Sequence, residues 1–255
     1  MSSNMASIGF DVSAEEVDDL LGAASDMVAE EFACPPGFLA VARYPSDSEL
    51  WVHIATSQQS PGSGEEEFEI VGFTPFHQTD TDVAVKVEGL EQADDDNAFE
   101  GRCEVWIGED EAYPMFFELV DYPVYGELAL PLKARASIIS LAKSVEGFED
   151  EEAFYAEQEN ESTQWASNFF IPVGKFVDDD GVAPTGSDMS MAWFAGTVIS
   201  LDRCEERSPY LHIKVETLSA TYDIFAAPEI VTGPVVVGGI VRVAGLMFGR
   251  LKLPA

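Results

Sequence analysis

The sequence predicts a mainly β protein of the α+β class, with an OB-like small β-barrel at its C-terminus and an acidic, β-rich unit before it. Three observations lead to this prediction. Short segments with alternating apolar and polar residues recur, acidic turn-like stretches separate them, and glycines interrupt the C-terminal segments. Hydrophobic residues make up 46% of the 255 residues, which is enough to form a packed core.

The first element is predicted as a helix over residues 13–33. Ser13 and Glu16 have the spacing of a capping box, and apolar residues recur at helical intervals from Val17 to Phe32. Two prolines and a glycine at positions 35–37 then end the helix.

A second long helix is predicted over residues 131–146. Pro131 suits a first helical turn, an apolar face runs from Ile138 to Val145, and Gly147 is a typical residue after a helix end. The acidic segment 149–161 follows, and it is predicted as either a short helix or a mobile arm.

The acidic unit between these helices is predicted to be built from strands with solvated turns. Alternating or short apolar runs place strands over residues 50–54, 83–87, 103–107 and 115–120. Residues 177–190 have the composition of a linker. The chain is therefore divided into residues 1–180, the acidic unit with its two helices, and residues 190–255, the barrel.

The C-terminal part contains four predicted strands, over residues 193–201, 210–218, 221–226 and 240–251. Gly196, Gly245 and Gly249 lie inside them, as glycines do at bends and bulges of small barrels. This region resembles the OB-fold barrels at the C-termini of uncharacterised bacterial proteins. The resemblance implies a fold and no activity, although OB folds often bind single strands or oligosaccharides.

The net charge of −34 is unevenly distributed along the chain. Residues 190–255 contain six acids and six bases, so residues 1–189 carry the whole excess. Three interpretations remain open: adaptation to high salt, an acidic face for a basic partner protein, or ordinary solvated surface. The charge disfavours nucleic acid as a partner, because a phosphate backbone needs cationic contacts.

The sequence contains few candidates for catalysis. Its histidines are His53, His77 and His212, and only His77 lies in a loop-like stretch, without a nucleophile motif nearby. Phosphate-binding glycine loops are absent. Carboxylate clusters at 80–82, 94–96 and 178–180 lack the spacing of a calcium loop, so neither a metal nor another cofactor is predicted.

The location is predicted to be cytoplasmic. No apolar run reaches the roughly 18 residues of a membrane helix, and the N-terminus lacks the features of a secretory signal. Three distant cysteines, Cys34, Cys103 and Cys204, do not suggest a disulfide framework or a zinc site. The sequence gives no indication of an oligomeric state.

These observations favour a non-enzymatic binding protein. One concrete form is an acidic inhibitor or immunity-type protein for a basic partner. The alternative is a small-ligand or oligonucleotide-binding OB-like module, with Tyr210, His212, Lys214 and Tyr222 as the ligand-binding residues. An enzyme that uses His77 ranks third, and it requires a concave pocket that holds His77 beside a carboxylate.

Overall fold

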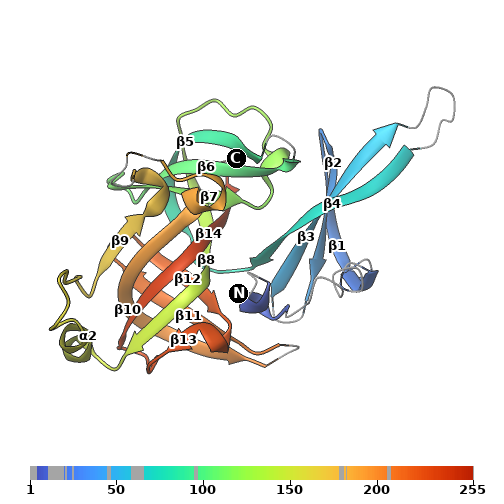
Figure 1. Cartoon of the computed structure of the whole chain (residues 1–255). Helices are drawn as coiled ribbons and strands as arrows, with labels where there is room; N and C mark the ends of the chain where they lie inside the picture. Colours follow the sequence, from blue (N-terminus) through green and yellow to red (C-terminus); the bar gives the residue numbers. More distant parts are fainter. Residues whose placement is uncertain are drawn as a thin grey trace.

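The computed structural model describes residues 5–10, 20, 22–24, 26–44, 47–58, 66–94, 97–177, 181, 183–205 and 208–254. The strands form one sheet of four strands and one of ten. In Figure 1 the four-stranded sheet lies on one side of the large sheet, and the short helix α2 (Glu151–Glu157) lies on the other. The mainly β content is confirmed, whereas the two long helices and the separate barrel are not.

The four-stranded sheet is an antiparallel meander. It consists of β1 (Val28–Cys34), β2 (Gly37–Arg43), β3 (Ser48–Gln58) and β4 (Glu66–His77), in that order. Cys34 pairs with Gly37, so the two prolines between them form a tight turn. Side chains of β2 and β3 such as Leu39 and Leu50 are fully buried, which gives this sheet an apolar face.

The predicted helix over residues 13–33 is wrong in its C-terminal part, because residues 28–34 form β1. Residues 13–19, 21 and 25 lie outside the described residues. Val28 and Phe32 are four positions apart, a spacing that shares one face in both a helix and a strand. Pairing with β2 favours the strand, and Phe32 stacks on Trp51 with ring centroids 5.5 Å apart.

The ten-stranded sheet is mixed and is organised around two long strands. Its members are β5 (Val83–Asp94), β6 (Asn97–Ile107), β7 (Tyr113–Leu119), β8 (Leu132–Phe148), β9 (Phe169–Pro172), β10 (Met191–Cys204), β11 (Tyr210–Thr217), β12 (Thr221–Ala226), β13 (Val231–Thr232) and β14 (Ile240–Lys252). β8 and β14 pair antiparallel along their length. β8 also pairs with β5 and β12, and β14 also pairs with β7 and β10.

The predicted helix over residues 131–146 is wrong, because this segment forms most of β8. Every residue from Ala136 to Ala142 is buried, so both faces of the strand are covered. A strand that is buried on both faces loses the alternation of apolar and polar residues, and its apolar run cannot be told from that of a buried helix.

The predicted OB-like barrel over residues 190–255 is also contradicted. The four predicted strands are confirmed as β10, β11, β12 and β14. However, β12 pairs in parallel with β8, and β14 pairs with β7 and β8, so these strands belong to the mixed sheet that includes the middle of the chain. Strands from before and after residues 177–190 therefore share one sheet.

The helical elements of the described residues are short. Besides α2 there are the 3-10 turns η1 (Ala6–Ile8), η2 (Tyr122–Val124), η3 (Val173–Lys175), η4 (Gly186–Ser190) and η5 (Pro228–Ile230). Residues 20 and 22–24 are also helical, as predicted for this part of 13–33. α2 begins at the cap residue Asp150, whose carboxylate accepts a hydrogen bond from the Ala153 amide at 2.8 Å. The alternative of a short helix within 149–161 is thus confirmed.

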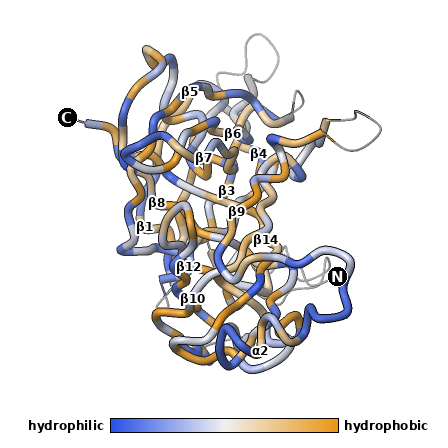
Figure 2. The backbone as a smooth tube through the Cα atoms, turned by 90° about the vertical axis from the view of Figure 1, so that its left-hand side faces the viewer, coloured by the Kyte–Doolittle hydropathy of each residue, from blue (hydrophilic) through white to orange (hydrophobic). Residues whose placement is uncertain are grey.

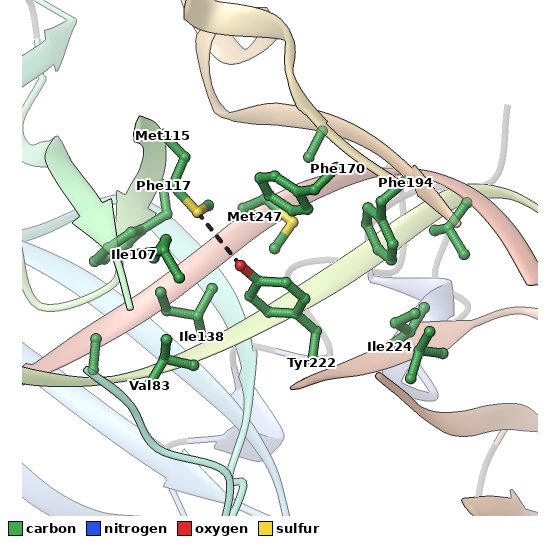
Figure 3. Packing of buried hydrophobic residues seen from close by; sticks show 14 of the residues in the cluster. Val83, Ile107, Met115, Phe117, Ile138, Phe170, Phe194, Tyr222, Ile224 and Met247 are labelled. Atoms are coloured by element: carbon green, nitrogen blue, oxygen red, sulfur yellow. Dashed lines mark hydrogen bonds between the residues drawn. The ribbon is translucent and has the colours of Figure 1, made fainter. Parts of the chain in front are cut away.

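The main core fills the interior of the large sheet (Figure 3). Tyr222 is fully buried there, and its ring stacks on Phe170 with centroids 5.4 Å apart. Its hydroxyl lies 3.0 Å from Ser219 Oγ and points toward Met115 Sδ, as Figure 3 shows. This core joins side chains of strands that are far apart in the sequence.

A second core joins the two sheets. It contains Leu39 and Trp51 of the four-stranded sheet together with Phe225 and Leu246 of the large sheet. The Arg250 guanidinium lies over the Trp51 ring, 4.5 Å from its centroid. Figure 2 shows hydrophobic and hydrophilic stretches interspersed along the chain. None of the helices in the described residues has the length and apolar character of a membrane span.

Candidate functional site

One face of β11 carries three of the four predicted ligand-binding residues. Tyr210, His212 and Lys214 alternate with the buried residues of this strand and therefore share a face. On the neighbouring strand β12, Phe225 pairs with His212 and Asp223 pairs with Lys214. The alternation of residues in the sequence therefore predicted correctly that these three side chains share one face of the strand.

The fourth residue, Tyr222, is on the other face. It pairs with Val215, so its side chain points into the main core. Burial raises the pKa of its hydroxyl, which is therefore neutral at physiological pH. Tyr210 is buried as well, with 1% of its surface exposed, although it lies on the same face as His212.

Asp223 is the electrostatic centre of this face. Its fully buried carboxylate accepts hydrogen bonds from His212 Nε2 at 2.6 Å and from Thr79 Oγ1. Burial alone would raise the pKa of Asp223, but the hydrogen bonds from His212, Thr79 and Thr81 outweigh it and lower the pKa to about 2. Lys214 Nζ bridges this carboxylate and Asp80, at 3.7 and 2.7 Å.

His77 ends β4 and joins this group. Its ring stacks on Phe225 with centroids 4.1 Å apart, and its Nε2 lies 3.1 Å from the Tyr210 hydroxyl. Its Nδ1 lies 2.7 Å from the Gln78 carbonyl oxygen. Because a carbonyl oxygen can only accept, Nδ1 carries a proton.

His77 and His212 line a surface pocket of about 510 Å³. Three carboxylates, those of Asp47, Asp80 and Asp202, line the same pocket. The geometric condition for an enzyme that uses His77 is therefore met. However, the side chain of His212 is hydrogen-bonded to Asp223, and His77 contacts the buried Tyr210 hydroxyl and the Gln78 carbonyl oxygen, so neither of these contacts activates an exposed nucleophile.

His53, the remaining histidine, is a core residue. It is fully buried in β3, its ring stacks on Phe99, and its Nε2 lies 3.1 Å from Thr74 Oγ1. Its Nδ1 is buried and has no hydrogen-bond partner among the described residues. Burial lowers the pKa of His53 to about 4, so the ring is neutral in the folded protein at neutral pH.

This burial predicts acid destabilisation. In the unfolded chain His53 titrates near its ordinary pKa of about 6.5, so between pH 6.5 and 4 the unfolded state binds more protons. The free energy of unfolding should therefore fall by about 3 kcal/mol as the pH drops through this window. Urea unfolding of the parent and of His53→Phe at several pH values tests this. The free energies of unfolding of the two proteins, plotted against pH, should diverge or converge between pH 6.5 and 4. Parallel plots would refute the prediction.

A groove on the outer face of the large sheet was not found by sequence reasoning. It has a volume of about 260 Å³ and is lined by Ser144, Glu146, Trp165, Phe169, Trp193, Arg242, Val243 and Ala244. The rings of Trp165 and Phe169 lie 5.3 Å apart, and Trp193 is 48% exposed. Arg242 is held by an ion pair with Glu146, its cross-strand neighbour. The sequence signal for this groove was a tryptophan, Trp193, at the start of a predicted strand.

The acidic arm, defined here as residues 149–161, lies next to this groove. It carries seven acids, all exposed: Glu149, Asp150, Glu151, Glu152, Glu157, Glu159 and Glu161. Phe154 anchors the arm, because it is fully buried in the same cluster as Trp165 and Phe169. Gln158 Oε1 accepts a hydrogen bond from the Trp165 amide at 2.6 Å. In Figure 2 the tube around α2 is mostly hydrophilic.

Most basic side chains of the described residues are already neutralised. Nine of the 12 bases among the described residues form ion pairs with acids: Arg43, Lys86, Arg102, Lys133, Lys175, Lys214, Arg242, Arg250 and Lys252. In the acidic arm, by contrast, none of the seven acids forms an ion pair with a described residue. The arm therefore contributes seven uncompensated acids to the excess negative charge.

Where the structure describes them, the acidic clusters at 80–82, 94–96 and 178–180 are not arranged to bind a metal ion. Asp80 pairs with Lys214, and Asp82 pairs with Lys252. Residues 95–96 and 178–180 lie outside the described residues. Across the described chain, no three His, Cys, Asp or Glu side chains are arranged to hold a metal ion.

No family model, curated protein or solved structure matches this chain.

Proposed function

We propose that this chain is a non-enzymatic binding protein whose acidic arm and adjoining aromatic groove recognise a basic partner protein. The observation that carries the proposal is their juxtaposition. Seven exposed acids lie beside a groove that contains Trp165 and the half-exposed Trp193, while most bases of the chain are occupied in ion pairs. An inhibitor or immunity-type protein that masks a basic surface is one form of this function.

The two parts of the surface supply different contributions. Exposed carboxylates accelerate the encounter with a basic protein and disfavour acidic competitors. Exposed tryptophans provide apolar area and a π face, over which a Lys or Arg side chain is attracted. Aromatic anchors of this kind dominate the binding energy of many interfaces. The groove would thus hold the partner that the arm attracts.

The alternative, an oligonucleotide-binding module, has less support. Bases stack on exposed aromatic rings and need a cationic groove beside them. Tyr210 and Tyr222 are both buried, and Lys214 is bound to Asp80 and Asp223. A small-ligand role for the pocket of His77 and His212 rests on its concave shape alone.

Binding of a fluorescently labelled octalysine peptide, followed by anisotropy at several salt concentrations, tests the proposal. The variant that combines Glu157→Lys, Glu159→Lys and Glu161→Lys should bind at least about tenfold more weakly. Trp193→Ala should also weaken binding, by about fivefold, because a cation–π contact is worth about 1 kcal/mol. The parent complex should weaken as salt rises.

The matched control is a second triple variant, Glu109→Lys, Asp110→Lys and Glu127→Lys. These acids are equally exposed, form no ion pair within the described residues and lie outside the arm. This variant changes the net charge by the same amount but leaves the acidic arm intact, so it should retain most of the affinity. If both triple variants lose affinity equally, the binding reports general charge and the proposal is wrong.

A further inference from the structure

A large open cavity among the described residues lies between the two sheets. It has a volume of about 760 Å³, within the range of small-molecule sites. One wall is formed by Phe73 and Pro75 of β4. The opposite wall comes from the large sheet, where Leu246 and Phe248 of β14 line it. A junction of two packed units is a common place for ligand pockets.

The apolar part of the lining, which is no larger than the polar part, would contact the body of a ligand. Phe99 and Leu119 complete the apolar lining. Behind Phe99 the packing is tight, because its ring stacks on the buried His53. Rigid aromatic walls of this kind give a preformed site, which lowers the entropy that binding must overcome.

Lys143 is the distinctive polar group of this cavity. It is exposed, and no ion pair holds it among the described residues, whereas nine other bases are paired. In the register of β8 with β14, Ala142 pairs with Gly245 and Ser144 pairs with Ala244, so Lys143 is the extra residue of a β-bulge. Bulges redirect a side chain relative to its neighbours and are frequent beside functional sites.

Apart from Lys143, the lining holds one cation, Arg102, and two carboxylates, Glu100 and Glu118, each of which forms hydrogen bonds. The buried Arg102 donates hydrogen bonds to Glu118 at 3.1 Å and to Glu91 at 3.3 Å, and Ser190 donates to Glu118. Glu100 accepts a hydrogen bond from the Asn97 amide. The carboxylates of the lining are therefore engaged, and Lys143 is left as the cation that a ligand could neutralise.

We propose that this cavity binds a small organic anion with an apolar body, whose charged end pairs with Lys143. The apolar walls accept the body, and the lysine at the bulge selects a carboxylate or sulfonate over a neutral group. Although the chain is strongly acidic, the distant acids are screened within about 8 Å at physiological ionic strength. This site is separate from the acidic arm and does not depend on the function proposed for it.

The probe for this test is 8-anilinonaphthalene-1-sulfonate, titrated into the full-length protein by fluorescence. We expect saturable binding at one site, with displacement by dodecanoate. Lys143→Glu should weaken binding at least about tenfold, and Lys143→Arg should stay within about twofold of the parent. N-phenyl-1-naphthylamine, which lacks the sulfonate, should bind more weakly than the anionic probe.

Two further variants separate the cavity from the general surface. Arg203→Glu makes the same charge change at another exposed base that forms no ion pair in the described residues, and it should leave binding unchanged. Ser187→Trp, at an exposed lining position, should obstruct the cavity and reduce binding. Equal affinity in the parent and Lys143→Glu, an equal loss in Arg203→Glu, or non-saturable binding would each overturn the proposal.

Discussion

Replacing Tyr222 by alanine is expected to lower the free energy of unfolding by about 4 kcal/mol, because removal of a large buried aromatic ring costs about 3–5 kcal/mol. The ring is fully buried and packs against Phe170 and Phe194, with centroids 5.4 and 6.0 Å away. These neighbours belong to strands that are held in the sheet, so they cannot collapse to fill the space. Urea unfolding at pH 7 measures the change.

The control for this variant is Tyr222→Phe, which keeps the ring. It loses the hydroxyl contact with Ser219 at 3.0 Å and should cost only about 1 kcal/mol. Together the two variants test whether the residue is structural. Should Tyr222→Ala unfold at the same urea concentration as the parent, the ring would not be part of the core, and a role in ligand binding would regain support.

Tyr222 also illustrates where sequence reasoning about the site succeeded and failed. Alternation within β11 correctly placed His212 and Lys214 on one face. Tyr222 was added because it is near in sequence, but the face of a strand is set by its pairing register, and Tyr222 opposes the core residue Val215. Asp223, the partner of His212, was missed because that contact depends on the same register.

The fold was predictable where strands bury one face. β5, β6 and β11 alternate clearly and were all predicted as strands. The prediction for β8 failed because both of its faces are covered. Ile138 and Val145 lie in the main core, and Ile139 and Leu141 lie in the second core, and both cores contain side chains from distant parts of the chain. No local pattern contains that information. The OB-like barrel failed for the same reason, since the strands after residue 190 depend on pairing with β8 and β7.

The aromatic groove depends on long-range contacts as well. Trp165 and Phe169 precede and begin β9, while Trp193 lies in β10 and faces a position on β14. Their convergence requires β9 and β14 to flank β10, which only the sheet topology establishes. The sequence marked the acidic arm through its charge, but it could not place that arm beside tryptophans.

Gly196 gives the second large expected effect. This residue lies inside β10, where it pairs with Thr217 on one side and with Val241 on the other. A Cβ atom at this position would be 2.2 Å from the Glu216 carbonyl oxygen and 2.9 Å from Val215 Cγ1. The carbonyl belongs to the backbone of β11, so it cannot rotate away as a flexible side chain could.

Gly196→Val should therefore lower the free energy of unfolding by about 4 kcal/mol, at the upper end of the cost of overpacking, because relief of the clash requires β10 and β11 to separate.

Gly89→Val is the matched control. Gly89 also lies inside a strand, next to a register shift of β5, but its added Cβ would contact only the Glu104 side chain, at 3.4 Å or more. That variant should remain within about 1 kcal/mol of the parent, since valine favours strands. If both variants were equally stable, β10 and β11 could not approach as closely as the pairing of Gly196 with Thr217 requires. The glycine would then mark a bend or bulge of the strand, as its place inside a predicted strand suggested, and not a point of close contact between backbones.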